Sequence, residues 1–169
     1  MAFNLGIIIS GRGSNMLNII NACQKGELLS NVSIVISNVP NAKGLSIAKQ
    51  KNIKTVLIDD KKIKNKVDFE NHLSRSLMKE KVNLVCLAGF MKILSKKFIK
   101  KWDIKIINIH PSLLPSFKGA NATEQAFKYK VKYTGCTMHY VNEEVDSGEI
   151  IDQKPVKILQ NDNLKSLKK

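Results

Sequence analysis

Arginine is scarce in this sequence of 169 residues: Arg12 and Arg75 are the only two among 28 basic residues. The others are lysines, which are spread over nearly every segment and leave a formal net charge of +14. Arginine is the usual reader of bases, and a nucleic-acid interface normally concentrates its charge on one face. Because the sequence also lacks an RNA- or DNA-binding motif, we interpret the lysines as a solvated surface and predict no nucleic-acid partner.

Cysteines are few and far apart. Cys23, Cys86 and Cys136 form no CxxC motif and no Cys/His cluster, so the sequence supports neither a zinc site nor a disulfide framework. We expect each cysteine to be a small buried hydrophobic residue and predict no bound metal. No apolar run approaches the ~20 residues that cross a bilayer, and the start lacks the features of a signal peptide. We therefore predict no membrane partner and a cytoplasmic location.

Short apolar runs alternate with amphipathic segments along the chain. Strands are predicted at 5–9, 32–36, 55–58, 84–88, 104–107, 137–141 and 150–158. Helices are predicted at 16–25, 42–51, 67–79, 95–101 and 121–128, with the start of another at 161–169. The helix at 67–79 carries an apolar stripe of Phe69, Leu73, Leu77 and Met78, and Ser95 is the predicted cap of the helix at 95–101. This alternation predicts an α/β fold with a mostly parallel, doubly wound sheet and helices on both faces. We find no repeat or linker and predict a single domain over residues 1–169.

A glycine-rich loop, Ser10-Gly-Arg-Gly-Ser-Asn15, follows the first predicted strand. Ligands of such sheets bind at the carboxyl ends of the strands. Glycines let backbone N–H groups approach an anion, the following helix N-terminus favours negative charge, and Ser14 and Asn15 can add side-chain donors. The loop is neither a Walker loop nor a GxGxxG motif, so a small phosphate monoester fits better than a dinucleotide. The alternative is a plain connection in which Ser14 caps the helix.

Asn108 and His110 are alternate residues at the end of the fifth predicted strand, so their side chains share a face. Held side by side, they can donate two hydrogen bonds to one developing oxyanion, although a lone histidine is often only structural. Asp146 is a third candidate because a carboxylate near His110 would orient the imidazole and favour its protonated form. Asp146 could equally open an Asp-Ser-Gly turn, and spacing alone does not establish that it meets His110.

The other two histidines carry less weight. His139 lies in a predicted strand, on the same face as Thr137 and Val141, and we interpret it as structural or as a support for the site. His72 lies in a lysine-rich helix and is expected to be exposed. Histidines scattered in this way do not predict a metal site.

Five motifs carry a resemblance to a known family. They are Ser10-Gly-Arg-Gly-Ser-Asn15, Leu87-Ala-Gly-Phe-Met-Lys-Ile-Leu94, Asn108-Ile-His-Pro-Ser-Leu-Leu-Pro-Ser-Phe-Lys-Gly119, Gly135-Cys-Thr-Met-His139 and Asp146-Ser-Gly148. Over essentially its whole length the chain resembles the folate-dependent phosphoribosylglycinamide formyltransferases of purine biosynthesis. The resemblance implies a Rossmann-like formyltransferase domain. It also implies transfer of a formyl group from 10-formyltetrahydrofolate to the amine of glycinamide ribonucleotide.

Carried over residue by residue, the resemblance implies three groups of site residues. The catalytic residues are Asn108, His110 and Asp146. The substrate phosphate is held by Gly13, Ser14 and Asn15. The folate is bound by Lys66, Met91, Lys92, Ile93, Leu94, Asn108, Asn142, Glu143, Glu144, Val145 and Asp146. Lys66 stands where the family often has an arginine, and a lysine would lose bidentate carboxylate binding. The expected partners are the two small molecules, without a metal, and the expected assembly is a monomer or homodimer.

The resemblance leaves three alternatives open. A formyltetrahydrofolate hydrolase would be expected to carry an extra N-terminal domain, and a methionyl-tRNA formyltransferase an extra C-terminal domain. The third alternative is a truncated, non-catalytic folate-binding module. The family usually continues with a helix whose acidic residue helps to hold the ribonucleotide. Because the sequence stops at Lys169, we expect the C-terminal helix to be incomplete and ribonucleotide binding to be weaker.

Overall fold

The computed structural model of the chain describes residues 3–63, 65–102 and 105–167. The strands are β1 (Phe3–Ile9), β2 (Ser30–Ser37), β3 (Thr55–Leu57), β4 (Leu84–Leu87), β5 (Ile106–His110), β6 (Tyr133–Tyr140) and β7 (Ile150–Lys157). The helices are α1 (Ser14–Gln24), α2 (Lys43–Gln50), α3 (Lys66–Lys79), α4 (Lys96–Trp102), α5 (Ala122–Lys128) and α6 (Leu164–Leu167). The chain divides into two compact units, Met1–Ile106 and Ile107–Lys169, and each is described separately.

The predicted fold class is confirmed. In the described part of the chain the strands form a seven-stranded sheet in the order β3-β2-β1-β4-β5-β6-β7. β1 pairs in parallel with β2 and β4, and β2 pairs in parallel with β3. β6 pairs antiparallel with β5 and β7. The β6–β7 pair is antiparallel because only a loop joins these strands, whereas a parallel pair needs a crossover long enough for a helix.

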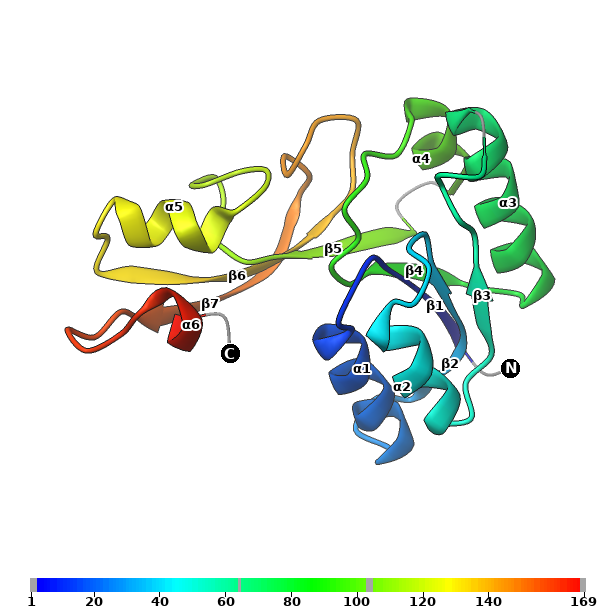
Figure 1. Ribbon diagram of the computed structural model, residues 1–169, viewed down its shortest axis with the longest axis horizontal. Coiled ribbons are helices and arrows are strands. Elements are labelled where there is room, and N and C mark those ends of the chain that lie inside the picture. The colour runs from blue at the N-terminus through cyan, green and yellow to red at the C-terminus, as the bar shows by residue number, and fades with distance from the viewer. Residues whose placement is uncertain (1–2, 64, 103–104, 168–169) are drawn as a thin grey trace. The chain divides into compact units, whose positions relative to one another are not determined.

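β1 is the centre of the first unit and is buried on both faces. Ile7, Ile8 and Ile9 are each 0% exposed. A Cβ on Gly6 would meet Leu77 of α3, whereas a Cβ on Gly44 of α2 would meet Ile9. Alternate residues of β1 therefore pack against different helices, as expected of a strand covered on both sides. Figure 1 shows α1 and α2 grouped together, apart from α3 and α4.

The element boundaries shift by a few residues from those predicted. β6 begins at Tyr133, earlier than the predicted 137. β5 was predicted at 104–107 but runs from Ile106 to His110, so Asn108 and His110 lie inside the strand rather than after it. Residue 104 of that prediction, and residues 168 and 169 of the predicted last helix, lie outside the described ranges. The predicted cap of α4 is confirmed, because the Phe98 N–H donates to Ser95 Oγ at 3.2 Å.

Two predictions of burial are wrong. Met78, assigned to the apolar stripe of α3, is 59% exposed. It lies about 100° around the helix from Leu77 and on the far side from Phe69. Cys136, expected to be buried, is exposed. Neighbouring residues of a strand point to opposite faces, and the next residue of β6, Thr137, is the one that is fully buried. Cys86 is buried as expected, and burial raises the pKa of its thiol to about 12.

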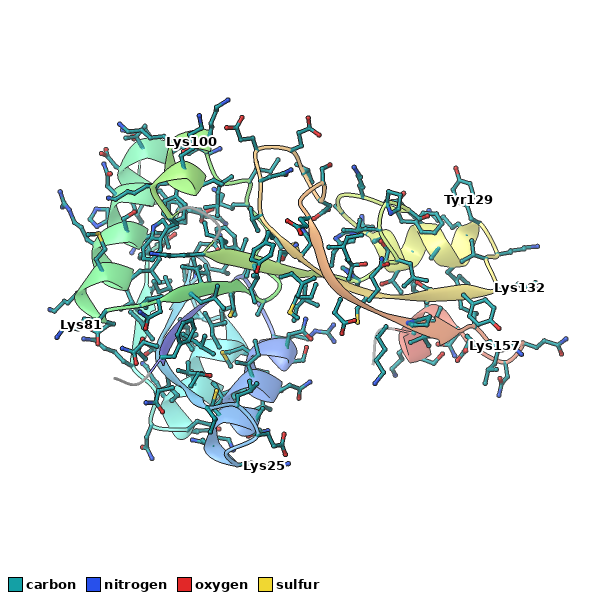
Figure 2. All side chains as sticks on the ribbon, turned by 180° about the vertical axis from the view of Figure 1, so that it is seen from behind. Lys25, Lys81, Lys100, Tyr129, Lys132 and Lys157 are labelled. Atoms are coloured by element: carbon teal, nitrogen blue, oxygen red, sulfur yellow. The ribbon has the colours of Figure 1, made fainter. Side chains whose placement is uncertain are left out.

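Exposed lysines occur on many elements of both units. Figure 2 labels Lys25 beyond α1, Lys81 beyond α3, Lys100 in α4, Lys132 before β6 and Lys157 at the end of β7, all on the outside of the chain. This distribution is consistent with a solvated surface. In the described ranges, no helix is both long and apolar enough to cross a membrane.

Replacing Gly13 with alanine is expected to destabilise the fold by about 2–4 kcal/mol. Gly13 has φ of +76°, and a Cβ there would lie 2.8 Å from the Cα of Gly44, a backbone atom with little freedom to move. Gly26→Ala is the matched control because Gly26 has the same φ but nothing within 4 Å of the added Cβ. Urea unfolding of both variants measures the difference. Equal losses would show that the contact with Gly44 does not matter.

Candidate active site

A depression of about 310 Å³ in the first unit lies beside the loop that follows β1. It is lined by Ser10, Gly11, Arg12, Gly13, Ser14, Asn15, Ala88, Gly89 and Met91. The structure thus brings the three predicted phosphate ligands to one pocket. Gly13 is the N-cap of α1, with no side-chain cap hydrogen bond. The first N–H groups of a helix lack intrahelical acceptors and favour an anion. The alternative in which Ser14 caps α1 is wrong.

Arg12 also lines this depression, although it was not among the predicted ligands. Its side chain is exposed and its guanidinium can donate several hydrogen bonds to a phosphate. The signal was present in the sequence, because one of only two arginines stands within the predicted anion loop.

The second unit brings together Asn108 and His110 with two residues of β6. The antiparallel register pairs Asn108 with His139 and His110 with Thr137. Residues directly opposite each other in such a pair have neighbouring side chains. His110 is 5% exposed and His139 is 2% exposed. The His139 side chain therefore belongs to the same polar cluster as Asn108 and His110. It contacts the predicted site residues directly.

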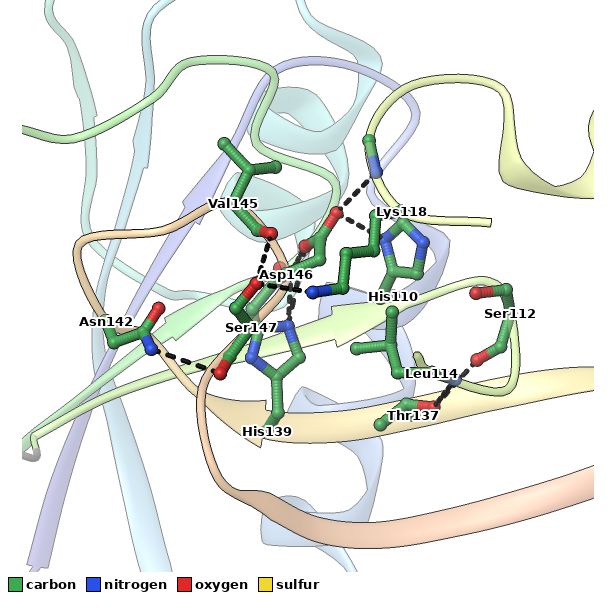
Figure 3. A network of polar contacts seen from close by, with 12 residues as sticks. His110, Ser112, Leu114, Lys118, Thr137, His139, Asn142, Val145, Asp146 and Ser147 are labelled. Atoms are coloured by element: carbon green, nitrogen blue, oxygen red, sulfur yellow. Dashed lines mark hydrogen bonds and ion pairs between the residues drawn. The ribbon is translucent and has the colours of Figure 1, made fainter. Parts of the chain in front are cut away.

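Asp146 joins this cluster, which spacing alone did not establish. Its Oδ2 lies 3.2 Å from His110 Nδ1 and accepts a hydrogen bond from the Gly119 N–H at 2.8 Å. Its Oδ1 lies 3.4 Å from Asn108 Nδ2 and 3.5 Å from His139 Nε2. Figure 3 shows the carboxylate between the two imidazole rings. One carboxylate therefore contacts four groups from three separate segments.

A tight turn sets the position of this carboxylate. Asp146 has φ of +49°, a left-handed conformation that aspartate tolerates better than most residues. Two residues later, a Cβ on Gly148 would collide with the Tyr140 carbonyl and lie 3.4 Å from His139 Nδ1. The turn covers Val145 and Asp146, so Asp146 lies inside a turn and does not open an Asp-Ser-Gly turn, the alternative considered for it.

His110 faces hydrogen-bond acceptors with both ring nitrogens. Nε2 lies 2.8 Å from the Phe117 carbonyl oxygen, and Nδ1 faces the Asp146 carboxylate. A carbonyl and a carboxylate can only accept, and a neutral imidazole has only one N–H to donate. A neutral ring can therefore donate to only one of these two acceptors at a time, whereas an imidazolium ring could donate to both.

The His139 contacts define its tautomer. Its Nδ1 lies 2.8 Å from the Tyr140 carbonyl oxygen, which can only accept, so Nδ1 carries a proton. In the neutral ring, Nε2 is then an acceptor for the Asn108 Nδ2 group at 3.2 Å. Asn108 thus directs its amide group to both His139 and Asp146, and its longer contact of 3.4 Å, to Asp146, is the weaker.

The loop that follows His110 is anchored by Thr137, which is 0% exposed. Its hydroxyl donates to the Ser112 carbonyl oxygen at 2.7 Å and accepts from the Leu114 N–H at 3.0 Å. Gln153 of β7 donates to the same hydroxyl oxygen at 2.9 Å. These bonds fix the start of the loop that carries the Phe117 carbonyl.

Most of the predicted folate residues are at the surface. In the first unit Met91 is 77% exposed and Ile93 is 65% exposed, Lys92 is also exposed, and the Leu94 side chain is buried. Lys66 is exposed at the first position of α3. The segment 91–94 therefore presents the side chains of Met91, Lys92 and Ile93 together with its backbone groups.

The remaining predicted folate residues form a loop of the second unit. Asn142, Glu143, Glu144 and Val145 are exposed. Asn142 shapes the loop by accepting from the Glu144 N–H and donating to the Ser147 carbonyl oxygen, both at 3.1 Å. Across the described ranges, no three His, Cys, Asp or Glu side chains are grouped so that they could hold a metal ion.

Comparison with known proteins identifies the family of this chain. The family model described as formyl transferase matches residues 3–169. The trifunctional purine biosynthetic protein adenosine-3 of Gallus gallus is 44% identical over 163 residues, which are 96% of this chain but 16% of that protein. The chain therefore spans about one sixth of these first relatives.

Shorter relatives match over most of their own length. Phosphoribosylglycinamide formyltransferase of Haemophilus influenzae is 39% identical over 96% of this chain and 77% of that protein. The crystal structure of phosphoribosylglycinamide formyltransferase from Anaplasma phagocytophilum superposes with a TM-score of 0.90 and 47% identity, covering 99% of this chain and 78% of that one. The chain therefore belongs to the formyl transferase family, among the phosphoribosylglycinamide formyltransferases.

Proposed function

We propose that the chain transfers a formyl group from 10-formyltetrahydrofolate to the amine of glycinamide ribonucleotide, a cytoplasmic step of purine biosynthesis. Membership of the family supports a folate-derived formyl donor. The observation that carries the proposal is the Asp146 carboxylate beside His110 and Asn108 in a partly buried cluster. Transfer of an acyl group to an amine needs donors for the developing oxyanion and an acceptor for the amine proton. This cluster offers both.

Asn108 and His110 supply the donors in this proposal. When the amine nitrogen bonds to the formyl carbon, negative charge develops on the formyl oxygen. The weaker Asn108 contact, at 3.4 Å to Asp146, is the one that the oxyanion would replace. His110 in its imidazolium form adds a charged donor, after its Nε2–H exchanges the Phe117 carbonyl for the oxyanion. The exchange costs little because one hydrogen bond replaces another.

Asp146 handles the proton. The attacking amine must lose a proton, and the folate nitrogen must gain one as its bond to the formyl carbon breaks. The carboxylate can accept the first proton, and the ion pair with His110 can deliver a proton to the leaving nitrogen, directly or through water. The net result is a formyl group and a hydrogen atom exchanged between two nitrogens, with no oxidation or reduction.

Other segments of the chain bind the two substrates in this proposal. Gly13, Ser14 and Asn15 hold the ribonucleotide phosphate in the depression at the N-terminus of α1. The segments 91–94 and 142–146 contribute to donor binding, with Lys66 as a point charge for the donor's carboxylates. The proposed partners are small molecules. That the chain forms a single domain, and that it is a monomer or homodimer, stay predictions.

Arg12→Ala is expected to raise KM for the ribonucleotide about three- to tenfold with little change in kcat. The reason is that an exposed guanidinium at the depression would contact the phosphate equally before and during the reaction. Arg75→Ala is the control, because Arg75 is exposed on α3 and does not line the depression. Steady-state kinetics with varied ribonucleotide provides the measurement. Equal KM values for the two variants would remove Arg12 from the phosphate site.

The proposal is tested by following 10-formyltetrahydrofolate consumption by absorbance, with and without glycinamide ribonucleotide. Turnover that requires the ribonucleotide supports the transferase. Turnover without it indicates a formyltetrahydrofolate hydrolase, and no turnover indicates a non-catalytic folate-binding module. A methionyl-tRNA formyltransferase would instead require charged initiator tRNA as the acceptor, which serves as a further arm of the same assay.

A further inference from the structure

Ser10 lies between the two segments that line the depression of the first unit. Its backbone N–H donates to the Gly89 carbonyl oxygen at 3.1 Å. Its side-chain oxygen accepts from the Met91 N–H at 2.8 Å and donates to Asn38 Oδ1 at 2.7 Å. Because Ser10 is the first residue of the anion loop, a shift of that loop moves the hydroxyl to which the Met91 N–H is hydrogen-bonded.

The hydrogen bonds continue from Asn38 and return to the residue after Met91. Asn38 is 4% exposed, and its Nδ2 donates to Asp60 Oδ2 at 3.3 Å. Lys92 Nζ lies 2.5 Å from the same carboxylate oxygen. The chain of bonds thus runs from the Met91 N–H through Ser10, Asn38 and Asp60 to Lys92. It starts and ends on adjacent residues, so it holds this segment by the Met91 backbone and by the Lys92 side chain.

These contacts form a closed ring of hydrogen bonds, and the donor and acceptor of each bond are defined. The Asp60 carboxylate only accepts, so Asn38 must present its NH₂ to Asp60 and its carbonyl to Ser10. Ser10 then donates to Asn38, which leaves its oxygen lone pairs for the Met91 N–H. The hydrogen bond from Lys92 lowers the pKa of Asp60 and keeps the carboxylate charged. The Lys92 ammonium also lies 5.7 Å from the centre of the Phe69 ring, a cation–π contact that further restrains it.

We propose that Ser10 and Asn38 are positioning residues that couple the anion loop to the segment Met91–Lys92. An anion that orders the loop then orders this segment through the Ser10 hydroxyl, and a ligand on the segment strengthens anion binding by the same factor. This inference rests on the proposed function for the identity of the two ligands, a phosphate ester and a folate. The coupling itself does not depend on catalysis.

Hydrogen exchange of a peptide covering residues 88–95, with and without inorganic phosphate, tests the coupling. In the wild-type protein phosphate is expected to slow exchange of this peptide. Ser10→Ala removes the hydroxyl and should abolish the slowing, whereas Ser10→Thr retains a hydroxyl and should restore it. Ser33→Ala is the matched control, because Ser33 donates to the Leu5 carbonyl oxygen in the same unit, away from the ring.

Binding of tetrahydrofolate in the presence of phosphate gives a second readout. Ser10→Ala is expected to weaken it about three- to tenfold, the range for one hydrogen bond, while Ser33→Ala leaves it unchanged. The inference is overturned if Ser10→Ala keeps the phosphate-dependent slowing of exchange, or if both variants bind tetrahydrofolate like the wild type. Failure of the proposed function is a separate result, since it appears as absent formyl transfer in a wild-type protein that still shows the phosphate effect.

Discussion

Replacing Asp146 with asparagine is expected to lower kcat about 10²–10⁴-fold, the range for loss of a general acid or base. The carboxylate lies 3.2 Å from His110 and receives hydrogen bonds from the backbone and from Asn108. An asparagine amide fits the same space but carries no charge and cannot take the amine proton. The measurement is acceptor-dependent formyl transfer at saturating substrates.

Asparagine is a better replacement than alanine at this position. Asp146 has φ of +49°, and asparagine adopts this left-handed conformation readily, whereas alanine would add backbone strain. Thermal unfolding should therefore show a folded Asp146→Asn protein. Asp152→Asn, on an exposed position of β7, is the control for loss of one carboxylate. The assignment fails if Asp146→Asn keeps the kcat of this control.

His110→Ala is the second change with a large expected effect, a loss of about 10²–10³-fold in kcat from removal of one oxyanion donor. The same change leaves the Phe117 carbonyl and one oxygen of Asp146 without their His110 partner. Each lost hydrogen bond costs about 0.5–1.5 kcal/mol, so the variant should also unfold at a lower temperature. Turnover should be measured well below that temperature and normalised to folded protein.

His72→Ala provides the comparison for His110→Ala, since His72 is exposed on α3 as the sequence predicted. It should leave both kcat and stability unchanged. A His110→Ala protein that turns over at the wild-type rate would exclude His110 from the chemistry, whatever its effect on folding.

The local parts of the site could be predicted from sequence. The anion loop was found because glycines between a strand and a helix have a direct physical reading, and it does line a depression. Asn108 and His110 were placed on one face because alternation in a strand is a local rule, which still holds although β5 starts and ends later than predicted. Both inferences need only neighbours in sequence.

The long-range parts could not be predicted in the same way. That Asp146 meets His110 depends on the register of β6 and on a left-handed residue in the following loop. The place of His139 opposite Asn108 follows from that register too. A shift of one residue would turn every side chain of β6 to the other face, and composition does not determine the register.

Transfer of a labelled formyl group is the most direct test of the proposed chemistry. The donor carries ¹³C in its formyl group, and mass spectrometry follows the label in a reaction that contains glycinamide ribonucleotide. We predict that the wild-type protein moves the label into the ribonucleotide, and that Asp146→Asn leaves the ribonucleotide unlabelled over the same time. Label released as formate with the ribonucleotide unchanged, or equal labelling by the two proteins, would contradict the account.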